Sequence, residues 1–222
     1  MTAHQYAIFC DFDGTVSSRD IGYHVYHHFS GGRTEELLPD WMAGRMSTRE
    51  CLRRESEMVS VTPEQFYAFV DTFELTDGFP EFVQRCRAED IPLYLLSDGL
   101  DIYIERVLAK YGITGLPVIC NKGRLVNNRI EIDFPYPDPR KTGGGVCKDD
   151  RIAAFRDGNK GPVKVVFVGD GLSDVKAIGQ SDVLFAKKDL KDYCERRNIP
   201  YYAFDTFFDV TTELVAQSVF TA

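Results

Sequence analysis

The sequence has no apolar run long enough to cross a membrane, and its beginning lacks the charged region and apolar segment of a secretory signal. We therefore expect a cytoplasmic protein with no membrane partner. Positive charge is also in short supply, because 26 Lys and Arg residues stand against 34 Asp and Glu residues, a formal net charge of −8. This balance argues against nucleic acid as a partner and favours a small-molecule ligand.

Paired cysteines are absent. Six cysteines are scattered along the chain without a Cys-x-x-Cys motif, so neither a zinc site nor a disulfide framework is indicated. The phosphate-loop order Gly-x-x-x-x-Gly-Lys-Ser/Thr is missing too, and the glycine run at 143–145 is interpreted as part of a linker over 135–146. What the chain does have is 222 residues, 44% hydrophobic and 27% charged, a composition able to bury a core.

Apolar patterns divide the chain into a helical block and an alternating region. Residues 17–75 carry apolar side chains at helical spacing and capping-box sequences at 47–50 and 62–65. From residue 78 onward, short apolar runs alternate with helical patterns, and strands are predicted at 93–96, 118–120, 163–168, 183–185 and 201–203. Repeated strand–helix units predict an α/β fold with a mostly parallel, Rossmann-like sheet flanked by helices.

The helical block interrupts this α/β region directly after its first predicted strand, at 6–10. We therefore predict a core domain formed by residues 1–16 and 76–222, with a helical cap domain inserted at 17–75. A β-hairpin is predicted over 123–134, because the Asn127-Asn128 pair at its centre tolerates the positive φ angles of such turns.

Two carboxylates follow the first strand in the stretch DFDGT at 11–15. Because side chains alternate along an extended chain, Asp11 and Asp13 are expected to point the same way and Phe12 into the core. Carboxylates this close repel unless a cation relieves them, and Mg²⁺ prefers oxygen ligands. An Asp-Gly turn is a plainer interpretation. An EF-hand calcium loop is excluded, since its twelfth position would be Gly22 instead of an acid.

Further polar residues follow two other predicted strands. The strand at 93–96 ends in Ser97-Asp98-Gly99, and the strand at 163–168 ends in the glycine-rich acidic stretch 169–174. Ligands of open α/β sheets bind beyond the carboxyl ends of the strands, so these segments are expected to meet the two aspartates. Taken singly, a serine here could be a helix N-cap, and Lys148 could be one solvated lysine among many.

The order of these elements resembles that of the haloacid dehalogenase superfamily, over nearly the whole chain: Asp11, Ser97, Lys148 and the pair Asp170 and Asp174. The resemblance implies a phosphoric monoester hydrolase that forms an aspartyl-phosphate intermediate. Members of the superfamily that remove halide lack an acid two residues after the nucleophile, so Asp13 favours phosphate chemistry.

The resemblance also implies catalytic roles. Asp11 would be the nucleophile, and Asp13 the general acid to the leaving alcohol and then the base for water. Ser97 and the N–H of Gly99 would hold phosphate oxygens, while Lys148 would neutralise charge on Asp11 and the phosphoryl group.

Mg²⁺ is the cofactor that the resemblance implies, and phosphoryl transfer relies on such charge neutralisation. Its ligands would be Asp11, the carbonyl of Asp13, and Asp170. Asp174 would support that site.

The block at 17–75 resembles the cap of the phosphoserine-phosphatase-like branch, which closes over substrate and excludes water. Asp20 falls where phosphoserine phosphatases carry a substrate-binding Glu. Arg45 is a candidate for reaching the substrate phosphate, with a solvated helix face as the plainer interpretation. His24 and His28 are four residues apart and could bind a metal, but a polar helix surface is favoured for them.

Segments at 120–121, 130–135 and 181–186 are similar to the 2-hydroxy-3-keto-5-methylthiopentenyl-1-phosphate phosphatases of methionine salvage. The expected partner is therefore a small phosphate ester. Three alternatives stay open: a phosphoserine phosphatase, a phosphotransferase with the same aspartyl-phosphate chemistry, and a phospho-acceptor signalling module. The last is disfavoured, because the DxD pair lies on the first strand and a large helical insertion follows.

Overall fold

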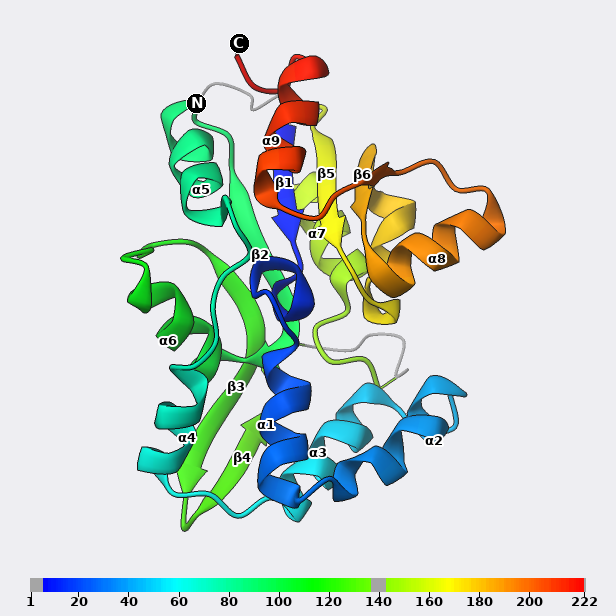
Figure 1. Cartoon of the computed structure of the whole chain (residues 1–222). Coiled ribbons are helices and arrows are strands. Elements are labelled where there is room, and N and C mark those ends of the chain that lie inside the picture. Colours follow the sequence, from blue (N-terminus) through cyan, green and yellow to red (C-terminus); the bar gives the residue numbers. More distant parts are fainter. Residues whose placement is uncertain (1–5, 137–142, 222) are drawn as a thin grey trace.

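The computed structural model describes residues 6–136 and 143–221. Strands within these residues form one sheet in the order β4-β3-β2-β1-β5-β6-β7. Every neighbouring pair is parallel except β3 and β4. The strands span Tyr6–Cys10 (β1), Leu93–Leu100 (β2), Val118–Val126 (β3), Arg129–Asp133 (β4), Lys164–Gly169 (β5), Val183–Ala186 (β6) and Tyr202–Ala203 (β7). The predicted mostly parallel α/β fold is confirmed (Figure 1).

Helices cover both faces of this sheet, and β1 is buried between them (Figure 1). Ile8 and Cys10 pack in the core beneath α5, α6 and α9, whereas Ala7 and Phe9 pack with α7, η3 and α8. Because β1 is buried on both faces, its successive side chains are all apolar, which explains the continuous apolar run in the sequence. The helices of this core are α5 (Phe79–Ala88), α6 (Asp101–Lys110), α7 (Lys148–Gly158), η3 (Leu172–Gln180), α8 (Lys188–Arg197) and α9 (Phe207–Ala216).

The block predicted to be helical is helical throughout. It contains α1 (Ile21–Ser30), η2 (Arg33–Leu37), α2 (Leu38–Met42), α3 (Thr48–Met58) and α4 (Pro63–Val70). Two of these helices start at the predicted signals, because the Ser47 side chain accepts from the N–H of Glu50, and Thr62 forms a full capping box with Gln65. Among the described residues, no helix combines the length and the apolar character needed to cross a membrane.

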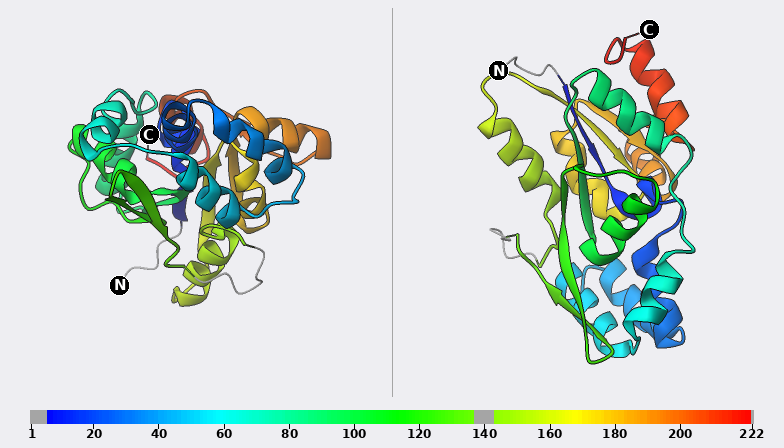
Figure 2. Two further views of the ribbon diagram at one scale, coloured as in Figure 1. Left: turned by 90° about the horizontal axis from the view of Figure 1, so that it is seen from below. Right: turned by 90° about the vertical axis from the view of Figure 1, so that its left-hand side faces the viewer.

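The chain enters and leaves the helical block at one place, where Ser17 and Leu75 form an antiparallel bridge. Figure 1 and the right-hand view of Figure 2 show the block at the end of the molecule opposite α9, where the parallel strands β1, β2 and β5 terminate. We propose that residues 17–75 are a cap domain on a core formed by 1–16 and 76–222.

The predicted hairpin is confirmed, and it reaches from the core beneath the cap. Asn127 and Asn128 form its turn with φ angles of 49° and 60°. The N–H of Val61 donates to the carbonyl of Asn128 at 2.9 Å, and Ser56 Oγ donates to the carbonyl of Ile130. The cap is therefore hydrogen-bonded to the sheet edge as well as joined to the core at its neck.

The linker predicted over 135–146 lies partly outside the described residues, which omit 137–142. At its described end, the carbonyl of Gly144 accepts from Arg49 Nε at 2.7 Å. Helix α3 of the cap is thus bonded to the segment that leads into α7.

Candidate active site

Asp11 stands at the carboxyl end of β1, the middle strand of the sheet. Its N–H donates to the carbonyl of Val168 in β5 at 2.9 Å, which extends the sheet pairing one residue past the strand. The chain then turns through η1 (Phe12–Val16), where Gly14 has a φ of 77°. A Cβ on Gly14 would lie 2.3 Å from Asp170 Oδ2, so this turn requires glycine. Phe12 is fully buried, as alternation along the chain predicted.

Lys148, the first residue of α7, places its ammonium between two buried carboxylates. Lys148 Nζ lies 2.5 Å from Asp11 Oδ1 and 2.6 Å from Asp174 Oδ1, and all three residues are buried. Burial alone would lower the pKa of Lys148, but Asp11 and then Asp174 raise it above its ordinary value. Burial raises the pKa of Asp11, and Lys148 opposes that shift. The ammonium therefore favours the ionised form of Asp11 and opposes the effect of burial.

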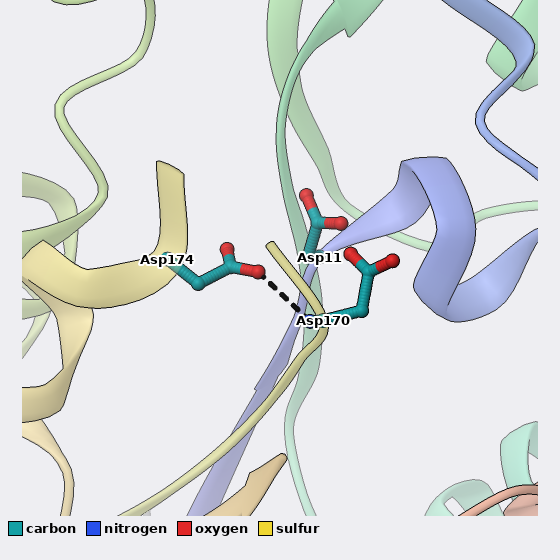
Figure 3. Close-up of side chains that lie close together, drawn as sticks. All are labelled: Asp11, Asp170 and Asp174. Carbon is teal, nitrogen blue, oxygen red and sulfur yellow. Dashed lines mark hydrogen bonds between the residues drawn. The ribbon is translucent and has the colours of Figure 1, made fainter. Parts of the chain in front are cut away.

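Asp170 follows β5 and lies beside Asp11, with Asp174 one turn further on (Figure 3). Asp174 Oδ2 accepts from the N–H groups of Asp170 at 3.0 Å and Gly171 at 3.1 Å, which fixes the loop. One carboxylate oxygen from each of the three aspartates lies within 4.8 Å of the others. This is a buried cluster of oxygen ligands that could hold a metal ion.

Asp13 is held from both domains of the proposed division. Its Oδ1 accepts from the N–H groups of Ile21 at 2.9 Å and Gly22 at 3.2 Å, at the start of α1. Its Oδ2 accepts from Tyr103 Oη at 2.7 Å. Burial, and secondarily the charge of Asp20, raise the pKa of Asp13 to about 7. A carboxyl with that pKa can both give and take a proton near neutral pH.

Ser97 and Gly99 lie where β2 reaches the same edge. Ser97 is buried, and its Oγ lies 3.4 Å from Asp13 Oδ2 while accepting from the N–H of Gly99 at 2.9 Å. A Cβ on Gly99 would lie 1.9 Å from Tyr103 Oη, so a larger residue would displace the tyrosine from Asp13. The predicted pair thus adjoins Asp13.

Two side chains at this edge were missed from the sequence. Tyr103 projects from α6 onto Asp13, and Lys188 Nζ bonds Asp170 Oδ2 at 2.8 Å and the carbonyl of Gly14 at 3.0 Å. Lys188 lies just after β6, so the rule that ligands meet strand ends could have found it. Nothing in the pattern of α6 marks Tyr103.

A cavity of about 420 Å³ lies above these residues and is lined from both the core and the cap. Its floor includes Asp11, Asp13, Ser97, Gly99 and Asp170. Cap residues form the opposite wall, and most of them are apolar or aromatic: Tyr23, Tyr26, Leu38, Trp41, Met42 and Leu52. The arrangement can hold a small molecule with one polar, anionic end against Asp11 and an apolar end in the cap.

The two candidate substrate residues of the cap lie in different places. Asp20 lines the cavity and caps α1, because its side chain accepts from the N–H of Tyr23 at 2.7 Å. Arg45 lies outside the cavity lining, is exposed, and pairs with Asp40 at 2.6 Å. The structure places Arg45 in a surface ion pair, and its contact with the substrate phosphate stays a prediction.

The histidines of α1 contact neighbouring side chains of the cap and are partly exposed. His28 stacks on Phe69 with ring centroids 4.5 Å apart, and His27 Nδ1 lies 3.3 Å from Glu35 Oε1. Among the described residues they join no cluster of three metal-binding side chains. The polar-surface interpretation fits this placement.

The chain matches a known family of hydrolases. Residues 8–178 match the family model of the haloacid dehalogenase-like hydrolases. The chain belongs to this family.

Two phosphatases are similar in sequence to the chain over nearly its whole length. The chain is 30% identical to 2-hydroxy-3-keto-5-methylthiopentenyl-1-phosphate phosphatase of Bacillus cereus (strain AH187), covering 93% of this chain and 94% of the relative. A phosphatase of the same name from Bacillus anthracis (strain CDC 684 / NRRL 3495) is 29% identical over the same shares. The prediction of a phosphoric monoester hydrolase of this family is confirmed.

Solved structures agree in fold. A phospho-aspartyl intermediate analogue of phosphoserine phosphatase superposes with a TM-score of 0.70 at 14% identity, covering 95% of this chain and 99% of that one. A phosphoserine phosphohydrolase-like protein from Francisella tularensis gives a TM-score of 0.68 at 18% identity, covering 94% and 99%. At these identities the likeness concerns the fold alone.

Proposed function

We propose that the protein is a Mg²⁺-dependent phosphomonoesterase that hydrolyses 2-hydroxy-3-keto-5-methylthiopentenyl 1-phosphate through an aspartyl-phosphate on Asp11. The observation that carries the chemistry is the buried Asp11–Lys148–Asp174 arrangement, of which Asp11 lines the cavity. The substrate assignment draws on the relatives named above and on the shape of the cavity. The cytoplasmic location expected from the sequence belongs to the same proposal.

The side chains at the sheet edge suit Mg²⁺. The cluster of Asp11, Asp170 and Asp174 offers only oxygen ligands, which is the donor set of a hard cation, and it contains no sulfur or imidazole. When bound, the ion would neutralise charge between the carboxylates and the phosphoryl oxygens. Asp174 is committed to Lys148 and to the N–H groups of its own loop, so we assign it support of the site.

The residues of this chain account for the two steps of the reaction. A carboxylate oxygen of Asp11 attacks phosphorus, the bond to the ester oxygen breaks, and Asp13 gives its proton to the leaving alcohol. Water then attacks the aspartyl-phosphate, Asp13 takes a proton from that water, and inorganic phosphate leaves with Asp11 restored. Lys148 balances the charge on Asp11, and Ser97 with the Gly99 N–H orients the phosphoryl oxygens.

The lining of the cavity supports the methionine-salvage ester over phosphoserine, the alternative that the sequence left open. Phosphoserine carries a carboxylate that a binding site must pair with a cation. Among the described residues that line the cavity, Lys188 is the one cationic side chain, and it bonds Asp170 at the phosphate end. The cap wall offers acids and apolar groups instead. An ester with an uncharged, partly apolar alcohol fits this wall better than phosphoserine does.

Release of inorganic phosphate from a panel of esters tests the proposal. The panel holds the methionine-salvage enol phosphate, phosphoserine and p-nitrophenyl phosphate, each with Mg²⁺ and with EDTA. We expect Mg²⁺-dependent release with the highest kcat/KM for the enol phosphate. A higher kcat/KM for phosphoserine would contradict the substrate, and full activity in EDTA would contradict the metal.

Mg²⁺ is expected to stabilise the fold more at about pH 8 than at about pH 5. Burial is the first cause that raises the pKa of both Asp11 and Asp170 above the ordinary value of 3.8. A carboxyl whose pKa is higher in the folded than in the unfolded protein stabilises the fold when it is protonated. That contribution is fully present below the unfolded pKa and is lost as pH rises through the folded pKa. Because Mg²⁺ and protons compete for these carboxylates, the gain from Mg²⁺ grows as pH rises.

Melting temperatures with and without MgCl2 at both pH values measure this effect, with KCl of equal ionic strength as control. At a Mg²⁺ concentration of 100 times Kd the gain at the higher pH is about 2.7 kcal/mol. An equal gain at both pH values would contradict the assignment of Asp11 and Asp170 as the carboxylates that bind the ion.

A further inference from the structure

Two polar groups in the cap wall of the cavity have no partner among the residues that the structure describes. Glu55 on α3 is 8% exposed and lines the cavity, and its carboxyl makes no hydrogen bond or ion pair with the residues the structure describes. Tyr26 on α1 is 2% exposed and lines the same cavity, and its buried Oη has no hydrogen-bond partner within residues 6–136 and 143–221. Neither residue belongs to the phosphate-binding floor.

Leaving such groups unpaired is costly. A buried hydroxyl such as that of Tyr26 is unfavourable without a hydrogen bond, and native proteins pair nearly all such groups. Two neighbouring polar groups of the cap are paired, because Trp41 Nε1 donates to Thr48 Oγ1 at 3.3 Å and Ser56 Oγ donates to the carbonyl of Ile130 in the hairpin. The unpaired state of Glu55 and Tyr26 inside a cavity indicates that a ligand supplies their partner.

The surroundings of the pair restrict the chemistry of that partner. Burial first, and then the nearby Asp20 carboxylate, raise the pKa of Glu55 to about 8. Near neutral pH Glu55 is therefore largely protonated, and it can donate through its O–H and accept through its carbonyl oxygen. Burial likewise raises the pKa of Tyr26 and keeps it a phenol. Neutral donors and an acceptor match an uncharged oxygen, and the Asp20 charge repels a carboxylate.

We propose that Glu55 and Tyr26 form a specificity subsite that binds a hydroxyl or carbonyl oxygen on the alcohol part of the substrate. The inference rests on the proposed phosphomonoesterase function and deepens it. The substrate phosphate would lie at Asp11, and the apolar end of the alcohol would lie against Leu38, Trp41 and Leu52. The oxygen-bearing part of the alcohol, which joins these two ends, would then lie in the cavity that Glu55 and Tyr26 line. The subsite would reject alcohols that lack the oxygen, because both groups would stay unpaired.

The test compares two esters that differ by one group, a 2-hydroxyalkyl phosphate and the same alkyl phosphate without the hydroxyl. The measured quantity is the ratio of their kcat/KM values. We expect Tyr26→Phe and Glu55→Leu each to lower this ratio by about tenfold to a hundredfold, the range for loss of a hydrogen bond. Glu55→Gln retains a donor and an acceptor and should keep most of the ratio.

Matched controls use Glu57→Gln on the exposed face of α3 and Tyr67→Phe on α4, both outside the cavity lining. Melting temperatures verify that each variant folds. A ratio that is the same in wild type, Tyr26→Phe and Glu55→Leu would overturn the subsite. So would a wild type that prefers an aminoalkyl phosphate and loses that preference in Glu55→Gln, because the partner would then be an ammonium.

Binding separates failure of the subsite from failure of the proposed function. The affinities of the same two esters are measured by calorimetry with Mg²⁺ on Asp11→Asn protein, alone and combined with Tyr26→Phe. If wild type hydrolyses neither ester, the proposed function fails, while tighter binding of the hydroxyalkyl ester that depends on Tyr26 still supports the subsite. Equal binding of both esters would overturn it.

Discussion

Asp11→Asn is expected to reduce turnover of every phosphate ester by about 10⁴-fold or more while leaving the fold intact. Loss of a nucleophile removes the covalent route, and comparable knockouts cost up to about 10⁶-fold. The amide has nearly the shape of the carboxylate, so the packing around β1 is retained. Steady-state phosphate release, with melting temperature as the measure of folding, checks the prediction.

The matched control for this variant is Asp98→Asn, which alters another carboxylate that lines the cavity. Asp98 Oδ1 accepts from the N–H of Val146 at 2.6 Å, so its loss disturbs the loop before Lys148 without removing the attacking atom. We expect a smaller loss there than in Asp11→Asn. Activity near wild type in Asp11→Asn would refute the role of the nucleophile.

Lys148→Met is expected to lower both activity and stability. Methionine fills the space of the lysine but leaves Asp11 and Asp174 as buried carboxylates without their shared cation. Removing one partner of a buried ion pair costs about 3–5 kcal/mol. Because burial raises the pKa of Asp11, protonation relieves the repulsion, and the deficit in the free energy of unfolding should shrink as pH falls.

Urea unfolding at two pH values, without Mg²⁺, measures this deficit. Lys176→Met, an exposed lysine on η3, is the control and should change stability by less than about 0.5 kcal/mol. A Lys148→Met protein as stable as wild type at neutral pH would show that the ammonium is not required to balance the two carboxylates.

The sequence was sufficient for the sheet and for the floor of the site because their signals are local. The strand at 6–10 is apolar on both faces, and parallel strands bring their carboxyl ends to one edge. Asp11, Ser97 and Asp170 each follow a strand predicted from the sequence, so their proximity could be predicted without coordinates, although β2 itself continues to Leu100. The hairpin at Asn127-Asn128 was predictable for a similar reason, since its turn depends on two adjacent residues.

The cap wall could not be predicted in the same way. Which side chains of α3 face the cavity depends on how that helix packs against the core. The sequence does not show which of its many charged residues is buried. Arg45 was the candidate, yet it pairs with Asp40 on the surface, whereas Glu55 lies buried in the cavity. Tyr103 likewise reaches Asp13 only because α6 packs beside the DxD turn.

The most direct test of the account is to locate the covalent phosphoryl group. Protein mixed with substrate and Mg²⁺ is quenched in acid and reduced with borohydride, which converts an aspartyl-phosphate to homoserine that peptide mass spectrometry can place. The account predicts homoserine at position 11, and none in protein quenched without substrate. Modification at another aspartate, or phosphate release with no modified residue under conditions that trap the intermediate, would contradict it.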